Sequence, residues 1–214
     1  MHGAGRSGRE AWPEQRDAGA VFADHSACLR MASKADVVGE QCPRGDVVVV
    51  AHSLGAVPAA LAHTAGNLTA SYVVLLEPAL YDIARGDDAI ERHIIPMTEA
   101  RECAETGDLF GYWQIVAPLM FGRSATRENW QVEQSLAQRF ADMDAPWGYG
   151  IEASVFAAVP TLVMTGDWND EYEAIAEQMT LAGAAHVQVP GAKHRPQDHP
   201  DFESVLADFT GTRV

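Results

Sequence analysis

Five short runs of apolar residues interrupt the otherwise mixed chain, and each predicts a strand. The strongest runs are Asp46–Ala51, Tyr72–Leu76 and Thr161–Thr165, the run His186–Val189 closes the series, and a weaker run lies at Gly19–Ala23. Val and Leu follow one another without polar residues between them, which is typical of strands covered on both faces. The pattern therefore predicts a mainly parallel sheet.

Between these runs, apolar residues recur at helical spacing. Helices are predicted at Ala56–His63, directly after the first strong strand, and at Phe202–Phe209, near the end of the chain. A third, at Asp170–Leu181, carries acidic residues in its first turn, where they interact favourably with the helix dipole. Strands that alternate with helices predict an α/β fold, with helices flanking the sheet.

The segment 82–159 breaks this alternation. It contains no convincing strand, and its spacing predicts helices at Asp88–Cys103, Asp108–Met120 and Asn129–Met143. We therefore expect an α/β core made of residues 1–81 and 160–214, with a helical insertion at 82–159.

The net charge and the cysteine content limit which partners and which cellular compartment we expect. The 214 residues include 15 Lys and Arg against 30 Asp and Glu, a net charge of −15. Such a surface repels phosphate backbones and anionic lipids, so we expect neither nucleic acid nor a membrane as partner. Three widely spaced cysteines do not indicate a disulfide framework, and no apolar stretch resembles a signal peptide or a spanning helix. The expected location is the cytoplasm.

The most informative local pattern is Val47–Ala56, in which a buried strand runs straight into Ala51-His-Ser53-Leu-Gly55 and then a helix. A sharp strand-to-helix turn strains its central residue, so the residues two positions away must be small. Ser53 would then stand exposed at the carboxyl end of the sheet, at the positive end of the following helix. This is the pattern of a nucleophile elbow, with Ala51 where the first glycine usually stands.

Three segments make the chain resemble the α/β-hydrolase superfamily over nearly its whole length. They are HGAG at His2–Gly5, AHSLGA at Ala51–Ala56 and GAKHRPQ at Gly191–Gln197. The resemblance implies that the helical insertion is a cap and that Ser53 is the nucleophile. It further implies that His194, after the last strand, is the base. The backbone N–H groups of Leu54 and Ala4 would bind the oxyanion.

Two positions compete for the acid that orients His194. The position after the penultimate strand offers Asp167, with Asp170 third in rank because it can simply begin the next helix. The position one strand earlier, used by some members of the superfamily, offers Glu77. A carboxylate at the end of an apolar strand is costly unless it has a partner, and an imidazolium is a suitable one. We favour Glu77 over Asp167.

The expected activity is that of a serine hydrolase of esterase type acting on a small, largely apolar ester, with no cofactor or metal. Ser at the elbow argues against dehalogenase and epoxide-hydrolase chemistry, which in this superfamily uses Asp. Trp113, Met120 and Trp147 either line the substrate pocket or are ordinary core residues. The alternative functions are a non-catalytic binding or regulatory protein on the same fold, or an inactive truncated hydrolase.

The resemblance also implies that a central strand normally precedes the His-Gly pair, whereas here Met1 stands directly before His2. We therefore expect an N-terminally truncated chain, or a misassigned start, with lower stability and activity than an extended version. The strand at Gly19–Ala23 would have to cover the edge of the Asp46–Ala51 strand. An uncovered edge would favour association into a homo-oligomer.

Overall fold

A computed structural model describes residues 7–14, 19–43 and 45–211. The chain divides into two compact units. Unit 1 consists of Met1–Ala84 and Pro146–Val214, and unit 2 consists of Arg85–Ala145. Unit 2 lies inside the range 82–159 expected for the helical insertion, and each unit has its own internal packing.

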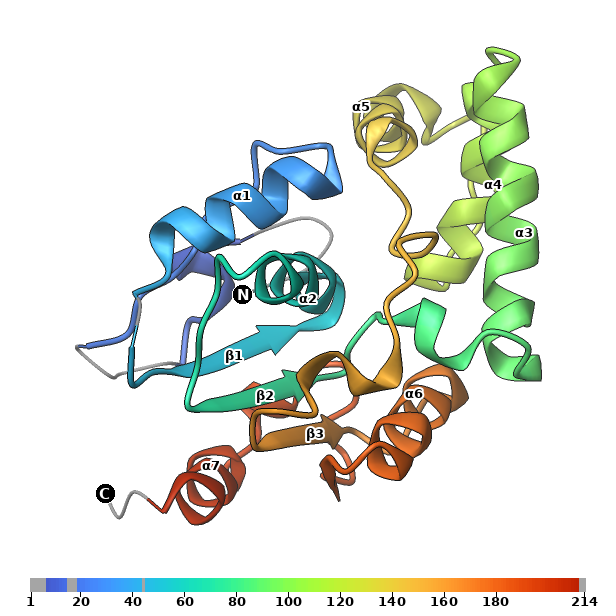
Figure 1. Cartoon of the computed structure of the whole chain (residues 1–214). Helices are drawn as coiled ribbons and strands as arrows, with labels where there is room; N and C mark the ends of the chain where they lie inside the picture. Colours follow the sequence, from blue (N-terminus) through green and yellow to red (C-terminus); the bar gives the residue numbers. More distant parts are fainter. Residues whose placement is uncertain (1–6, 15–18, 44, 212–214) are drawn as a thin grey trace. The chain divides into compact units, whose positions relative to one another are not determined.

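Unit 1 contains a parallel sheet whose strands follow one another in chain order (Figure 1). The register pairs Val50 with Val74 and Val74 with Leu162, so the apolar runs lie side by side. Four of the five predicted strands are confirmed within two residues at each end. The strands are β1 (Val48–His52), β2 (Tyr72–Leu76), β3 (Thr161–Thr165) and β4 (Ala185–Gln188).

Helices flank this sheet, as the sequence predicts. Short 3-10 turns also occur, and two of them, η2 (Ser53–Gly55) and η3 (Tyr81–Ala84), follow the ends of β1 and β2. In Figure 1, α1 and α2 lie next to each other beside β1. The helices of unit 1 are α1 (Met31–Gln41), α2 (Ala56–Thr64), α6 (Asp170–Leu181) and α7 (Phe202–Thr210). Of these, only α1 has no counterpart among the predicted helices.

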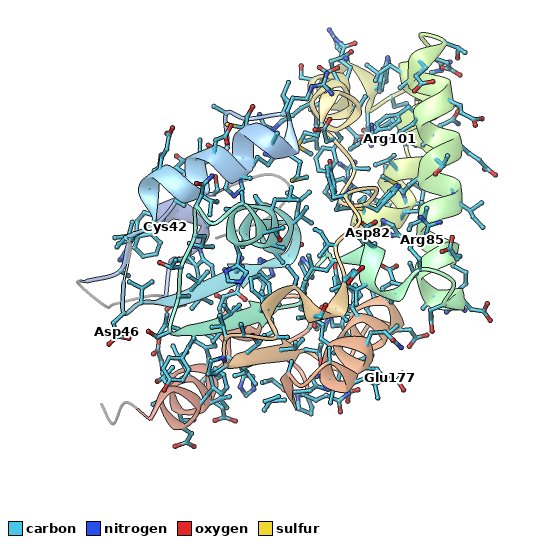
Figure 2. The ribbon with its side chains drawn as sticks, in the orientation of Figure 1. Cys42, Asp46, Asp82, Arg85, Arg101 and Glu177 are labelled. Carbon is cyan, nitrogen blue, oxygen red and sulfur yellow. The ribbon has the colours of Figure 1, made fainter. Side chains whose placement is uncertain are left out.

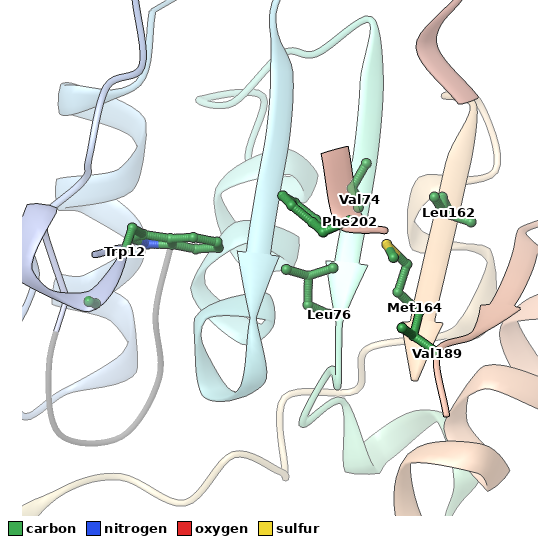
Figure 3. Packing of buried hydrophobic residues seen from close by; sticks show 8 residues of the cluster. Trp12, Val74, Leu76, Leu162, Met164, Val189 and Phe202 are labelled. Carbon is green, nitrogen blue, oxygen red and sulfur yellow. The ribbon is translucent and has the colours of Figure 1, made fainter. Parts of the chain in front are cut away.

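One face of the sheet carries a continuous apolar cluster (Figure 3). Alternate residues of β2 and β3 point into it because successive side chains of a strand point to opposite faces. Helix α7 covers this face with Phe202 and, less deeply, Phe209, and Trp12 adds an indole from the N-terminal part of the chain. The cluster consists of Ala11, Trp12, Val74, Leu76, Leu162, Met164, Val189 and Phe202.

The strand predicted at Gly19–Ala23 is wrong. Residues 19–25 have no regular secondary structure apart from a turn. The apolar side chains there are used individually: Phe22 packs against the cluster of Figure 3, and Ala23 is 2% exposed. The carbonyl of Ala23 accepts a hydrogen bond from the N–H of Gly8 at 3.2 Å. An apolar run thus marks buried side chains, and does not by itself require a strand.

Unit 2 consists of three helices, all predicted from the sequence to within two residues. They are α3 (Asp88–Glu105), α4 (Leu109–Phe121) and α5 (Trp130–Asp142). Asp87 and Asp108 cap the first two with side-chain hydrogen bonds to backbone N–H groups. Within residues 7–14, 19–43 and 45–211, no helix has both the length and the apolar character needed to cross a bilayer.

The buried side chain of His25, in unit 1, makes the free energy of unfolding depend on pH. His25 is 1% exposed, and burial, assisted by the charge of Lys34, lowers its pKa to about 4. Its unfolded pKa is about 6.5, so below that pH the unfolded chain binds a proton that the folded chain does not. The stability contribution of neutral His25 is complete above pH 6.5 and is lost progressively as the pH falls towards 4.

Urea unfolding followed at pH 7.5 and pH 5.0 measures this contribution. We expect His25 to account for a loss of about 2 kcal/mol in the free energy of unfolding between these two values. A His25→Gln variant should show a correspondingly shallower pH dependence, whatever its absolute stability, whereas the control His199→Gln, at a partly exposed position, should keep the wild-type slope. An unchanged slope in His25→Gln would contradict the assignment.

Candidate active site

Backbone strain is concentrated at the carboxyl edge of the sheet. Among the described residues, the non-glycine positions with positive φ are Ser53 (54°), Glu77 (46°), Asp167 (55°) and Lys193 (51°). The first two directly follow β1 and β2, the third is the second residue after β3, and the fourth directly precedes His194. Left-handed backbone costs of order 1 kcal/mol or more in residues with a side chain, and it gathers at functional sites.

Ser53 occupies the turn predicted for a nucleophile. It follows the last residue of β1, begins the η2 turn, and α2 starts at Ala56. The residues two positions to either side, Ala51 and Gly55, are buried and have no bulky side chain, which lets the chain turn sharply. Leu54, whose N–H is the predicted oxyanion donor, is 5% exposed within the same turn.

Glu77 and His194 face each other across this edge. The Glu77 side chain is 1% exposed, and its Oε2 atom lies 3.6 Å from Nδ1 of His194. His194 is more accessible, with 37% of its side chain exposed. Because Nδ1 faces the carboxylate, Nε2 is the ring nitrogen left to exchange a proton with another group.

The buried carboxylate of Glu77 is held by two donors from the loop after β3. The N–H of Gly166 donates to Oε1 at 2.6 Å, and Nε1–H of Trp168 donates to Oε2 at 2.9 Å. These bonds offset the cost of removing the carboxylate from water, and they fix the oxygen that faces His194. The loop that contains Asp167 thus supplies donors to Glu77.

His52 fixes the backbone of the histidine loop. Its Nε2 atom lies 2.6 Å from the carbonyl oxygen of His194, and the two imidazole rings are 4.7 Å apart. His52 is fully buried beside Ser53, so the elbow and the histidine loop are connected directly.

Tyrosines of the η3 turn and of helix α6 lie near this edge. Tyr81 donates a hydrogen bond to Oε2 of Glu171 at 2.9 Å. The ring of Tyr172 packs against that of His194, with 5.3 Å between their centroids. The sequence analysis did not identify Tyr172, Tyr81 or Trp168, because nothing in the spacing along the chain indicates these cross-loop contacts.

The remaining predicted acids lie elsewhere. Asp167 is exposed, and within the described part of the chain the carboxylate beside Nδ1 of His194 is that of Glu77. Asp170 is the first residue of α6, and the preceding Asn169 caps that helix by accepting a hydrogen bond from the N–H of Glu171. Ala4 and the rest of His2–Gly5 lie outside the described residues.

The three residues predicted to bind substrate fall in two units. Trp147, in unit 1, is half-buried, and its ring packs edge-on against Tyr81 at 5.8 Å. Its loop is held by Asp82, labelled in Figure 2, which accepts hydrogen bonds from the N–H groups of Gly148 and Tyr149. Trp113 and Met120 belong to unit 2. Trp113 is fully buried against Phe121 and Phe140, which favours the core alternative for that residue, whereas Met120 is 38% exposed.

The backbone of the histidine loop passes so close to Gly166 that no side chain fits at this position. A Cβ atom added there would lie 2.0 Å from the carbonyl oxygen of Lys193, in backbone directly before His194. We expect Gly166→Ala to push this backbone away, lengthening the contact between His194 and Glu77, and to destabilise the fold by about 1–3 kcal/mol. Thermal unfolding measures the stability, and hydrolysis rates measure the site. A variant with wild-type values for both would contradict the described approach of the two loops.

Comparisons with known proteins agree with this architecture. A model of the alpha/beta hydrolase family matches residues 2–203. A hydrolase from Oleispira antarctica is similar in structure, with a TM-score of 0.55 and 15% identity over 85% of this chain and 72% of that chain. MenH from S. aureus gives a TM-score of 0.53 and 13% identity over 92% and 79%. An alpha/beta hydrolase from a Medee basin deep-sea metagenome library, MGS-M2, gives 0.54 and 13% over 90% and 76%. No match was found among curated proteins.

Proposed function

The chain belongs to the alpha/beta hydrolase family, and from this premise we propose that it is a serine hydrolase of esterase type. Its substrate is a small, largely apolar ester or related acyl compound. Ser53 is the nucleophile, His194 the base, and Glu77 the acid that orients the imidazole. The N–H group of Leu54 is one donor to the oxyanion, and that of Ala4 is proposed as the other.

The observation that carries this proposal is the set of strained residues at one edge of the sheet. Ser53 and Glu77 both hold a left-handed backbone, and Lys193 does so directly before His194. A protein without chemistry at this edge has no reason to keep three such residues at the ends of neighbouring elements, since each costs stability. The 3.6 Å approach of Glu77 to His194 supports the same interpretation.

In the proposed reaction, Nε2 of His194 accepts the hydroxyl proton of Ser53 as Oγ attacks the carbonyl carbon. The imidazolium that forms is stabilised by the negative charge of Glu77, which is buried and therefore weakly screened. His194 then gives the proton to the departing alcohol. Water repeats the sequence to release the acid and regenerate Ser53.

Trp147 is proposed to contact the apolar part of the substrate, because its half-buried ring packs on Tyr81, in the η3 turn that follows β2 and Glu77. For Met120 of unit 2 the same role stays a prediction, whereas the buried Trp113 is a core residue of that unit.

A fluorophosphonate probe tests the proposal directly, since it reacts with serines activated by a neighbouring base. We expect labelling of the folded wild type, with the adduct mapped to Ser53 by mass spectrometry. A folded wild type that is not labelled and cleaves no ester would support the rival function, a non-catalytic binding protein on the same fold.

A further inference from the structure

The orientation of the Glu77 carboxylate depends on the groups around it. The last torsion of a glutamate side chain, χ3, is broad and roughly two-fold, so it does not by itself fix where the two oxygens point. Each oxygen of Glu77 accepts a hydrogen bond, Oε1 from the N–H of Gly166 and Oε2 from Nε1–H of Trp168. Trp168 therefore holds the same oxygen that lies 3.6 Å from Nδ1 of His194.

The two donors differ in kind. Gly166 donates through its backbone N–H, which every residue type except proline has, whereas Trp168 donates through its side chain. Without the indole N–H, the carboxylate would keep its bond at Oε1 and could rotate about χ3, which would move Oε2 away from the imidazole. The direction of Oε2 thus depends on the side chain at position 168.

The indole also contacts the base. The ring of Trp168 lies edge-on to that of His194, with 5.9 Å between the centroids, and packs against Tyr172 at 6.3 Å. Trp168 is 49% exposed, whereas Glu77 is 1% exposed. The N–H group therefore points to a buried carboxylate while part of the ring faces solvent, and one side chain contacts both Glu77 and His194.

The left-handed backbone of Asp167 accounts for the way in which both donors reach Glu77. Asp167 stands between Gly166 and Trp168, and its φ is 55°. Successive residues of an extended chain point to opposite sides, whereas a left-handed residue turns the chain, so that the N–H before it and the side chain after it face one carboxylate. The side chain of Asp167 is itself exposed. The strain at position 167 therefore directs the neighbours of Asp167 and not its own carboxylate.

We propose that Trp168 is a positioning residue of this hydrolase, whose indole N–H holds Oε2 of Glu77 opposite Nδ1 of His194 and so acts on the base through the acid. The inference rests on the function proposed above and adds the residue that sets the direction of its carboxylate. It also gives a reason for the fourth strained position, Asp167, at the edge of the sheet.

Trp168 transfers no proton in the reaction. When Oγ of Ser53 attacks the ester, its proton moves to Nε2 of His194, and the proton on Nδ1 stays on the imidazolium. The indole keeps its own proton in the bond to Oε2. The charge of the imidazolium is stabilised most when Oε2 faces Nδ1, because the attraction between opposite charges falls with distance. Fixing that oxygen before the reaction begins removes the need to reorient it during the proton transfer.

The first test is Trp168→Phe, which keeps an aromatic ring beside His194 but has no N–H group. We expect kcat for 4-nitrophenyl butyrate to fall about 10- to 100-fold with little change in KM, as for loss of one hydrogen bond to a charged group. Circular dichroism verifies folding. An unchanged kcat overturns the inference. A raised KM with unchanged kcat does so as well, because Trp168 would then contact the substrate and not the acid.

The second test combines Trp168→Phe with Glu77→Gln to ask whether Trp168 acts through Glu77. If it does, the two losses do not add, and Trp168→Phe should lower the rate less than about threefold in the Glu77→Gln background. Reactions with enzyme in excess over substrate keep these slow variants measurable, and Ser53→Ala gives the background rate. A merely structural role for Trp168 gives the same loss in both backgrounds, and that result overturns the inference.

The matched control is Trp130→Phe, at the start of α5 in unit 2, where the indole packs against Phe110. It should keep the wild-type kcat. If Trp168→Phe does not fold, 3-benzothienylalanine placed at position 168 has the shape of tryptophan with sulfur in place of the N–H group. It should lower kcat as expected for Trp168→Phe, and a wild-type kcat would overturn the inference.

Failure of the underlying function gives a different result. In that case the wild type itself neither cleaves 4-nitrophenyl butyrate nor reacts at Ser53 with the fluorophosphonate probe, and both proposals are overturned together. A wild type that is labelled and active, with equal losses from Trp168→Phe in the presence and absence of the Glu77 carboxylate, overturns only the role of Trp168.

Discussion

Ser53→Ala is expected to lower kcat for ester hydrolysis by about 10⁶-fold, to the level left by the other groups of the site. The substitution removes only the Oγ atom, and alanine retains the Cβ that the turn already accommodates at φ 54°. The backbone path from β1 into α2 should therefore persist, and the loss should reflect chemistry and not folding.

Purified wild type and Ser53→Ala should be compared by steady-state hydrolysis of 4-nitrophenyl butyrate and by thermal unfolding. The matched control is Ser154→Ala, an exposed serine in the η4 turn (Ala153–Phe156), which should retain wild-type kcat. Hydrolysis that survives in Ser53→Ala at more than about a hundredth of the wild-type rate would assign the nucleophile to another group.

Glu77→Gln is expected to lower kcat by about 10⁴-fold while KM changes little. Glutamine has the same shape but carries no charge, so the imidazolium of His194 loses its counter-ion. Its amide also presents an NH₂ group in place of one carboxylate oxygen. That group would face a donor, either the N–H of Gly166 or the indole N–H of Trp168, which leaves a buried donor unsatisfied.

The matched control is Asp167→Asn, on the same loop edge. Asn tolerates the left-handed backbone that Asp167 has, and the side chain is exposed, so we expect kcat within about threefold of the wild type. The comparison uses 4-nitrophenyl butyrate at saturating concentration, with circular dichroism to verify folding. The reverse ranking, a large loss in Asp167→Asn and a small one in Glu77→Gln, would move the acid to Asp167.

Much of the fold could be predicted because it depends on short-range regularities. Continuous Val and Leu runs mark buried strands, and their order with intervening helices predicts a parallel sheet. Helix α1 is not among the predicted helices because MASKADVVGEQ places a charged residue, Lys34, on the buried face, where it is 3% exposed. Its amine donates to the carbonyls of His25 and Cys28, partners that no helical periodicity indicates.

The sequence by itself determined the turn at Ser53, because small residues two positions away and a strand-to-helix transition are local properties. It also proposed His194 as the base, because the resemblance to the α/β-hydrolase superfamily implies a histidine after the last strand. It could only rank Glu77 above Asp167, since both follow strands whose carboxyl ends meet at one edge. The tertiary structure sets the two apart: Glu77 is buried, bonded to Gly166 and Trp168, and 3.6 Å from His194, whereas Asp167 is exposed.

The same reason explains why the contact of Tyr172 with His194 could not be found from the chain alone. Tyr172 lies in the acidic first turn of a helix, where spacing predicts only a helix start. Parallel pairing of the strands brings their carboxyl ends to one edge, and the segments that follow them meet there, so that the ring of Tyr172 packs against that of His194. Residue types and local turns can be predicted from the sequence. The distances between loops are determined only by the assembled sheet.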